Sequence, residues 1–294
     1  MATAPSNGIQ LCYETFGDPA DPALLLVMGF TAQMTAWEEP FCRMLAERGR
    51  YVIRFDNRDT GLSTHLDGVP VDLMGVLGAW EAGTPMPPVP YDLWTFAEDS
   101  FGLLDHLGIE RAHIAGASMG GMIVQAMAIA HPERVLSMTS IMSTTGEADY
   151  GQPAPDALEA LMTPPPFERE AFVQFGVERA KLFCSPRYFD PDRVGARMAA
   201  AYDRAFYPEG AMRQLAAIRA SGSREDALPQ VDVPTLVVHG RADRLIDYSG
   251  GLRTAELIPG ANLLLLNDMG HDLPEPLWPL VVDAIASHTT HLVG

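Results

Sequence analysis

The chain has 294 residues, 47% of them hydrophobic, which is enough material to bury the core of one domain that carries an insertion. Its formal charge of −18 at pH 7 opposes binding to the phosphates of nucleic acids or to an anionic membrane surface, so neither is an expected partner. Three cysteines, Cys12, Cys42 and Cys184, are too few for a disulfide framework and favour a reducing, cytoplasmic setting.

The start of the chain carries no pattern of a targeting segment. Residues 1–10 lack the basic stretch and the following apolar run of an export signal. The longest apolar run, residues 23–28, is too short to span a bilayer. Neither export nor membrane insertion is therefore expected.

Strands and helices are predicted to alternate along the first part of the chain. Residues 24–27 and 51–55 are short apolar runs bounded by turn residues, which is typical of buried parallel strands. Residues 93–107 carry apolar side chains near helical spacing, with Asp92 as the expected N-cap and Gly108 as the glycine that follows the helix. This alternation predicts an α/β fold with a doubly wound, mainly parallel sheet.

Two segments interrupt the alternation. Residues 66–90 are rich in proline and glycine and read as a loop, with a short helix around residues 71–80. Residues 145–223 begin with a proline-rich stretch and continue in a helical pattern with many aromatic and methionine side chains. We therefore predict an α/β core made of residues 1–144 and 224–294, interrupted by a helical cap at 145–223.

A G-x-S-x-G motif, Gly116-Ala117-Ser118-Met119-Gly120, lies between a predicted strand and a predicted helix. Residues 112–115 read as the strand that leads into it, and residues 121–127 read as the helix that leaves it. Such a junction holds the serine on a tight bend, where flanking glycines permit the close approach of strand and helix. The motif predicts Ser118 as a nucleophile, although the pentapeptide alone also fits a serine that caps a helix.

A serine hydroxyl needs a base and an orienting carboxylate before it can attack an acyl group at neutral pH. Asp243 follows the apolar run 235–238, and His271 follows the apolar run 263–266, so both lie just past predicted strand ends. The order serine, acid, histidine is the one expected for this kind of strand-turn-helix site. We predict that Ser118, Asp243 and His271 form a catalytic triad.

Other acidic and imidazole side chains are weaker candidates. Asp247 is expected in the following turn or helix start, and Asp268 is too near His271 in sequence to orient its ring. His239 at a strand end favours a packed or hydrogen-bonded role. The remaining candidates lack the loop context of His271: His65, His106, His113 and His131.

A tetrahedral intermediate needs preorganised donors for its oxyanion. The backbone N–H of Met119, directly after the nucleophile, is one expected donor. The second is expected from the loop at residues 28–31, where the N–H of Phe30 is the best candidate. Gly29 in the same loop also fits an ordinary turn.

With these residues in place, the chain resembles the α/β-hydrolase superfamily over nearly its whole length. Residues 55–63 look like the D-x-R-G-x-G-x-S loop of that family, which supports the site, with Asp59 where glycine is commonest. Residues 16–29 and 258–261 are similar to actinobacterial carboxylesterases and lipases of the aclacinomycin methylesterase type. Met28 stands where many relatives have histidine, but esterases of that type also use Met-Gly.

The resemblance implies a serine hydrolase that acts on carboxylic esters of small, apolar molecules, without a metal or organic cofactor. Thioesterases, lactonases, perhydrolases and C–C bond hydrolases use the same triad and stay open as alternatives. Dehalogenases and epoxide hydrolases of this fold use an aspartate nucleophile, so Ser118 argues against both. A ligand-binding sensor on the same scaffold is a less favoured alternative. The sequence leaves the physiological ester and the oligomeric state open.

Overall fold

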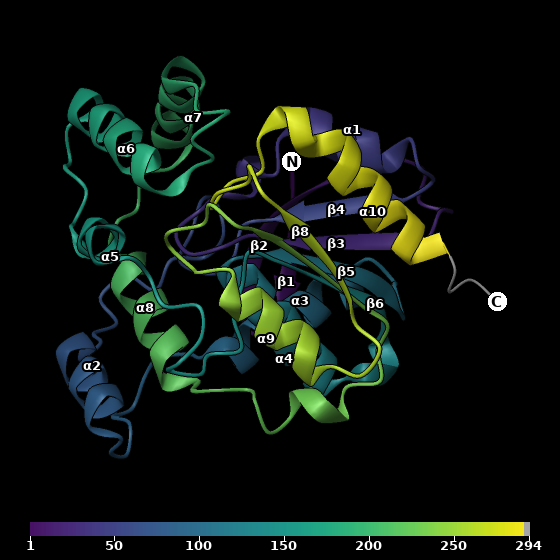
Figure 1. Cartoon of the computed structure of the whole chain (residues 1–294), viewed down its shortest axis with the longest axis horizontal. Coiled ribbons are helices and arrows are strands. Elements are labelled where there is room, and N and C mark those ends of the chain that lie inside the picture. The colour runs from purple at the N-terminus through teal and green to yellow at the C-terminus, as the bar shows by residue number, and fades with distance from the viewer. Residues whose placement is uncertain (291–294) are drawn as a thin grey trace.

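An eight-stranded sheet forms the centre of the protein (Figure 1), for which the computed structural model describes residues 1–290. The strand order is β1-β2-β4-β3-β5-β6-β7-β8. Strand β2 pairs antiparallel with both of its neighbours, β1 and β4. The strands β4, β3, β5, β6, β7 and β8 all run parallel to one another. The strands are β1 (Ala2–Ser6), β2 (Ile9–Phe16), β3 (Ala23–Val27), β4 (Tyr51–Phe55), β5 (Ala112–Ala117), β6 (Val135–Ile141), β7 (Thr235–Gly240) and β8 (Asn262–Leu266).

Helices cover both faces of this sheet, as the doubly wound prediction requires. One face packs against α1 (Glu39–Ala46) and α10 (Trp278–Thr290), and the other packs against α3 (Leu93–His106), α4 (Met119–Ala130) and α9 (Ser249–Leu257) (Figure 1).

Strand β3 shows how one sequence serves both layers. Its side chains alternate between the two faces. Leu25 and Val27 join the hydrophobic cluster with α3 and α4, while Leu24 and Leu26 join the cluster with α1 and α10. Because all four leucine and valine side chains are fully buried, β3 reads in the sequence as a continuous apolar run.

Helix α3 confirms the helix predicted at residues 93–107. Helix α3 begins after Asp92, whose carboxylate accepts a hydrogen bond from the Thr95 N–H at 2.8 Å. Gly108, just beyond the helix, has a left-handed φ of +71°. Strand β6 was not predicted, because Ser137, Thr139 and Ser140 interrupt the continuous apolar run that marks the other central strands.

Four helices lie within the segment predicted as a cap, and they gather on one side of the sheet (Figure 1). They are α5 (Pro155–Met162), α6 (Arg169–Phe183), α7 (Pro191–Arg204) and α8 (Gly210–Ala220). Helix α2 (Leu73–Ala82), from the other irregular segment, packs against α8. The two segments that interrupt the strand-helix alternation therefore meet in space.

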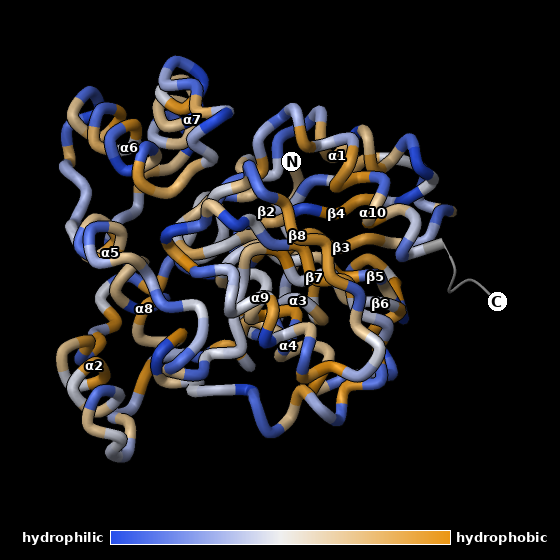
Figure 2. The backbone as a smooth tube through the Cα atoms, in the orientation of Figure 1, coloured by the Kyte–Doolittle hydropathy of each residue, from blue (hydrophilic) through white to orange (hydrophobic). Residues whose placement is uncertain are grey.

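Hydropathy separates the two parts of the molecule. Figure 2 shows hydrophobic stretches concentrated in the strands of the sheet, whereas polar and apolar residues alternate along α5 to α8. Among residues 1–290, no helix combines the length and the hydropathy needed to cross a membrane. Cys12, Cys42 and Cys184 are all free thiols.

Candidate active site

The sharp turn between β5 and α4 presents Ser118. This residue has φ 58° and ψ −120°, a conformation that side-chain-bearing residues rarely adopt and that only the surrounding structure maintains. The Ser118 N–H donates to the Ile141 carbonyl of β6 at 2.9 Å, which holds the turn against the sheet. A Cβ at Gly116 would collide with the Gly120 carbonyl, and a Cβ at Gly120 would collide with the Val27 carbonyl of β3, so the turn can pack this closely only because glycine occupies both positions.

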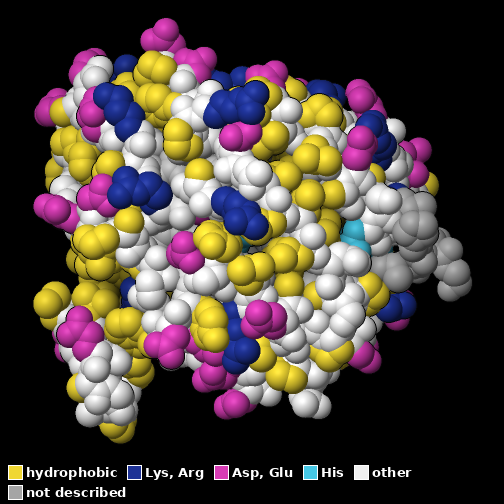
Figure 3. All heavy atoms as spheres, viewed as in Figure 1, with side chains coloured by type: hydrophobic (Ala, Val, Ile, Leu, Met, Phe, Trp, Pro, Cys, Tyr) yellow, Lys and Arg dark blue, Asp and Glu magenta, His cyan; other side chains and the backbone are white. Residues whose placement is uncertain are grey.

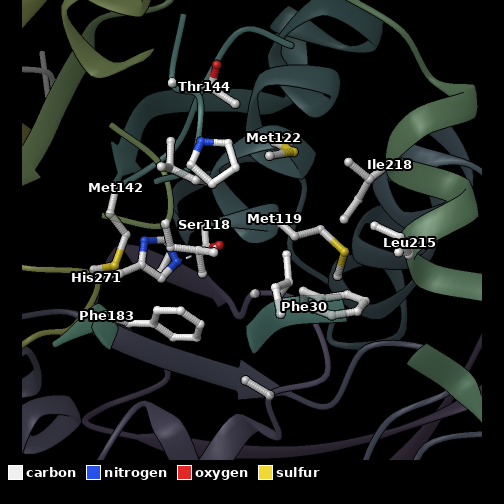
Figure 4. Close-up of a pocket in the computed structure, with 18 of the residues that line it drawn as sticks. Phe30, Ser118, Met119, Met122, Met142, Thr144, Phe183, Leu215, Ile218 and His271 are labelled. Atoms are coloured by element: carbon white, nitrogen blue, oxygen red, sulfur yellow. Dashed lines mark hydrogen bonds between the residues drawn. The ribbon is translucent and has the colours of Figure 1, made fainter. Parts of the chain in front are cut away.

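His271 reaches Ser118 from the loop that follows β8. Its Nε2 lies 2.9 Å from the Ser118 Oγ, and its Nδ1 lies 2.7 Å from the Asp243 Oδ2 (Figure 4). The backbone N–H of His271 donates to the Phe183 carbonyl at the end of α6 at 2.6 Å, which fixes the loop that carries the ring. The structure thus brings together three side chains that the sequence placed after three different strands.

Asp243 is fully enclosed at the end of β7. Its Oδ1 accepts hydrogen bonds from the N–H groups of Leu245 and Ile246, both at 2.9 Å, which leaves Oδ2 for His271. Burial by itself would raise the pKa of this carboxyl group, but the interactions with His271 and His239 outweigh burial and lower its pKa to about 2. Asp243 is therefore ionised at neutral pH and can orient an imidazole.

The competing acids and histidines take other roles. Asp247 accepts the Ser249 N–H, and the exposed Asp268 pairs with Arg187 at 2.7 Å. His239 is buried behind Asp243, with its Nε2 at 2.9 Å from the Ile246 carbonyl oxygen and 3.5 Å from the Asp243 Oδ2. The four other candidate histidines do not line the pocket: His65 contacts Gly61, His106 contacts Tyr13, His113 contacts Ser137 and His131 contacts Glu98.

The loop after β3 lies directly against Ser118. A Cβ built on Gly29 would approach the Ser118 Cβ to 2.9 Å, so only glycine lets this backbone come so close. Within residues 1–290, the backbone N–H groups of Phe30 and Met119 have no hydrogen-bond acceptor, and both residues line the pocket around Ser118 (Figure 4). Two free donors beside the nucleophile suit an oxyanion that forms during acyl transfer.

Two side chains that are not among the predicted site residues hold this loop in place. Gln214 of α8 is buried and accepts the N–H of Thr31 at 2.8 Å, at a residue with a left-handed φ of 58°. Asn57 donates to the Met28 carbonyl at 2.8 Å from the opposite end of the loop. Gln214 carries no local sequence signal, because its contact partners are more than 150 residues away in the chain, whereas Asn57 lies in the loop at residues 55–63 that resembles a supporting loop of the family.

Buried ion pairs connect the loop at residues 55–63 to the helices beside the sheet. Asp59 adopts a left-handed φ of 61°, which explains why glycine is commonest at this position. Its carboxylate accepts hydrogen bonds from Arg213 of α8 at 2.8 and 3.0 Å and from the Tyr91 hydroxyl at 2.6 Å. Asp56 pairs with Arg204 at 2.8 Å. The departure from glycine thus gains a charge partner in α8.

A cavity of about 330 Å³ opens at Ser118 and His271 between the sheet edge and the helices α2, α5, α6 and α8. Its apolar wall is formed by side chains from both parts of the molecule, among them Phe30, Met119, Met122, Met142, Phe183, Leu215 and Ile218 (Figure 4). Within the described part of the chain, no group of His, Cys, Asp and Glu side chains is arranged to hold a metal ion.

Known proteins of related sequence are hydrolases. Two rhodomycin D methylesterases, DauP of Streptomyces sp. (strain C5) and DnrP of Streptomyces peucetius, are each 27% identical to this chain. The alignments cover 96% and 97% of this chain and 95% and 96% of the relatives.

Known structures share the architecture. A meta-cleavage product hydrolase from Pseudomonas fluorescens IP01 matches with a TM-score of 0.80 at 19% identity, over 99% of this chain and 98% of that one. The family model of the alpha/beta hydrolase fold matches residues 22–275. The chain therefore belongs to the α/β-hydrolase family, as its resemblance to esterases of the aclacinomycin methylesterase type predicted.

Proposed function

We propose that this protein is a serine hydrolase that cleaves carboxylic esters through an acyl-enzyme intermediate. The observation that carries the proposal is the continuous hydrogen-bonded series from Asp243 through His271 to Ser118, with distances of 2.7 and 2.9 Å. This series has the arrangement of nucleophile, base and orienting acid that activates a serine hydroxyl.

The first half-reaction follows from these contacts. Asp243 accepts the Nδ1–H of His271, which leaves Nε2 free to take the proton of Ser118 as Oγ attacks the ester carbonyl. The resulting tetrahedral oxyanion accepts hydrogen bonds from the N–H groups of Phe30 and Met119. Each of these donors stabilises the transition state by about 3 to 4 kcal/mol. His271 then gives its proton to the departing alcohol, and Ser118 keeps the acyl group.

The second half-reaction repeats these steps with water. His271 removes a proton from a water molecule as the oxygen of that water attacks the acyl carbonyl. Collapse of the second tetrahedral intermediate releases the carboxylic acid and returns the proton to the Ser118 oxygen. The cycle needs no metal or organic cofactor.

Esters of small molecules are the proposed substrates. The cavity of about 330 Å³ has the size of a small-molecule site, and its many methionine, leucine and aromatic side chains favour apolar acyl or alcohol groups. The similarity to rhodomycin D methylesterases also supports ester substrates. We assign residues 145–223 as the cap that shapes this cavity. The three free thiols support the proposed cytoplasmic setting.

The proposal can be tested with Ser118→Ala on a panel of p-nitrophenyl esters, thioesters and lactones. Loss of the nucleophile should lower kcat for the best substrate by roughly a million-fold, because the triad acts as a unit. Ser137→Ala is the control, because Ser137 is a buried serine of the central strand β6 that contacts His113 instead of the site.

Two results would contradict the proposal. Near-normal ester hydrolysis by Ser118→Ala would exclude Ser118 as the nucleophile. A wild-type protein that fails to react stoichiometrically with a fluorophosphonate would favour a ligand-binding protein on this fold. Preferential turnover of a thioester or a lactone would keep the mechanism but change the substrate class.

A further inference from the structure

Four arginines contribute to the lining of the cavity: Arg179, Arg197, Arg219 and Arg224. Arg197 pairs with Glu38 at 3.3 Å, and Arg224 donates to Gln125 and to two carbonyl groups of its neighbourhood. Within residues 1–290, Arg179 and Arg219 have neither a carboxylate within 4.0 Å nor a hydrogen-bond acceptor for their side chains. Two cationic groups at the cavity are therefore unpaired.

The acidic side chains of the lining do not balance them. Glu147 is paired with Arg253 at 3.0 Å, and Asp272 accepts hydrogen bonds from the N–H and the hydroxyl of Ser185. The lining thus carries an excess of positive charge inside a protein whose formal charge is −18. Figure 3 shows Asp and Glu side chains interspersed with Lys and Arg side chains over one face of the protein.

Arg219 is the more exceptional of the two unpaired arginines. Its Nε is buried without any acceptor, and its Cζ lies 4.2 Å from the ring centroid of Trp80. Burial lowers the pKa of its guanidinium, and Glu81 opposes this only from beyond ion-pair distance. Arg179 instead lies near two rings, Phe175 and Phe183, and has no buried N–H without an acceptor.

The buried Nε–H of Arg219 has no acceptor, and a bound anion would offset the free-energy cost of this unsatisfied donor. The Trp80 ring holds the Arg219 Cζ at 4.2 Å from its centroid, and among the described residues no acceptor occupies the N–H groups of this guanidinium. A planar carboxylate matches such an edge with two parallel hydrogen bonds. Arg219 immediately follows Ile218, whose side chain points into the cavity beside Phe30 and Met119 (Figure 4).

We propose that Arg219 and Trp80 form a carboxylate-binding subsite, so that the preferred substrates are esters that carry a second, ionised carboxyl group. The subsite rests on the proposed ester hydrolysis at Ser118 and names the class of ester that it selects. Arg219 determines specificity in this arrangement and takes no part in the bond-breaking steps.

The test compares two p-nitrophenyl esters of equal length, one ending in a carboxylate (mono-p-nitrophenyl adipate) and one ending in a neutral amide (p-nitrophenyl adipamate). The wild type should favour the carboxylate by roughly 10-fold or more in kcat/KM, because charged hydrogen bonds are the strong ones. Arg219→Leu should bring the ratio to about one, and Arg219→Lys should give an intermediate ratio.

Arg197→Leu is the matched control, because it removes an equal charge from the same lining at a residue that already has a carboxylate partner. It should keep the wild-type ratio. A ratio near one in the wild type, a ratio that survives Arg219→Leu, or an equal loss in Arg197→Leu or Arg179→Leu would overturn the assignment.

A measurement on the wild type alone covers the case in which Arg219→Leu does not fold. Free adipate should inhibit hydrolysis of p-nitrophenyl acetate at concentrations roughly 10-fold lower than adipamide does. Equal inhibition would overturn the subsite. If the wild type hydrolyses neither ester nor p-nitrophenyl acetate, the proposed function fails; if it hydrolyses both esters equally well, only the subsite fails.

Discussion

The sheet edge and the cap helices differ in how their residues are buried. Helix α4 of the core is buried along almost its whole length, whereas the longer α6 of the cap buries only Val177 and Phe183. Among the described residues, α5, α6 and α7 contribute no member to the two hydrophobic core clusters. Core packing thus surrounds the loops of Ser118, Asp243 and His271, whereas α5, α6 and α7 pack outside the two core clusters.

The difference explains where the proposed roles lie. Ser118, Asp243 and His271 all follow core strands, where packed neighbours hold them within hydrogen-bond distance. The cap contributes Arg219 and much of the cavity wall. Rigid core loops suit chemistry that tolerates little displacement, and cap helices with fewer buried contacts can vary with the substrate.

The largest effect in the core is expected from Asp243→Asn. The amide cannot stabilise an imidazolium and favours the wrong tautomer of His271, so kcat should fall by roughly 10,000-fold, as in other enzymes with this arrangement. Steady-state hydrolysis of a p-nitrophenyl ester measures the loss. Asp268→Asn is the control, because Asp268 is exposed and pairs with Arg187. A comparable loss in both variants would contradict the role of Asp243.

A contact between cap and core should have a smaller effect. Gln214→Leu removes the acceptor of the Thr31 N–H, which loosens the loop that carries Phe30. We expect kcat to fall by roughly 10- to 100-fold with a smaller change in KM, because a displaced oxyanion donor weakens mainly the transition state.

Gln33→Leu is the matched control for this variant. Gln33 is also a buried glutamine that connects core and cap, but it donates to the Ala201 and Ala205 carbonyls of the cap. Affinity for a trifluoromethyl ketone should fall with kcat in Gln214→Leu and stay near the wild-type value in Gln33→Leu. Equal losses in the two variants would mean that Gln214 acts only through general stability.

The smallest expected effect concerns stability in acid. The pKa of Asp243 is lowered from 3.8 to about 2 in the folded protein, so its ionised form contributes stability above the unfolded-state value. This contribution, about 2 kcal/mol, should disappear as the pH falls from about 4 toward about 2. Urea unfolding of the wild type and Asp243→Asn measures it: the stability difference should narrow over this range. A constant difference would contradict the lowered pKa.

Local sequence was enough to predict those strands and helices whose apolar runs or capping residues lie within a few positions of one another. The apolar run of β3 and the capped helix α3 were predictable, because burial on both faces and helix capping both leave patterns within a few residues. Strand β6 and the antiparallel pair β1 and β2 were missed, because polar residues or edge exposure break such patterns.

For the site, the sequence alone determined which chemistry to expect, since Ser118, Asp243 and His271 each follow a recognisable strand in the required order. Only the tertiary structure decided which side chains surround these three residues. Gln214 binds the loop that carries Phe30, Arg213 pairs with Asp59, and Arg219 lies over the Trp80 ring without a carboxylate partner. These contacts join residues about 140 to 180 positions apart in the chain. Packing of the folded chain determines which side chains meet at such a separation. Such contacts therefore leave no periodic pattern in the local sequence.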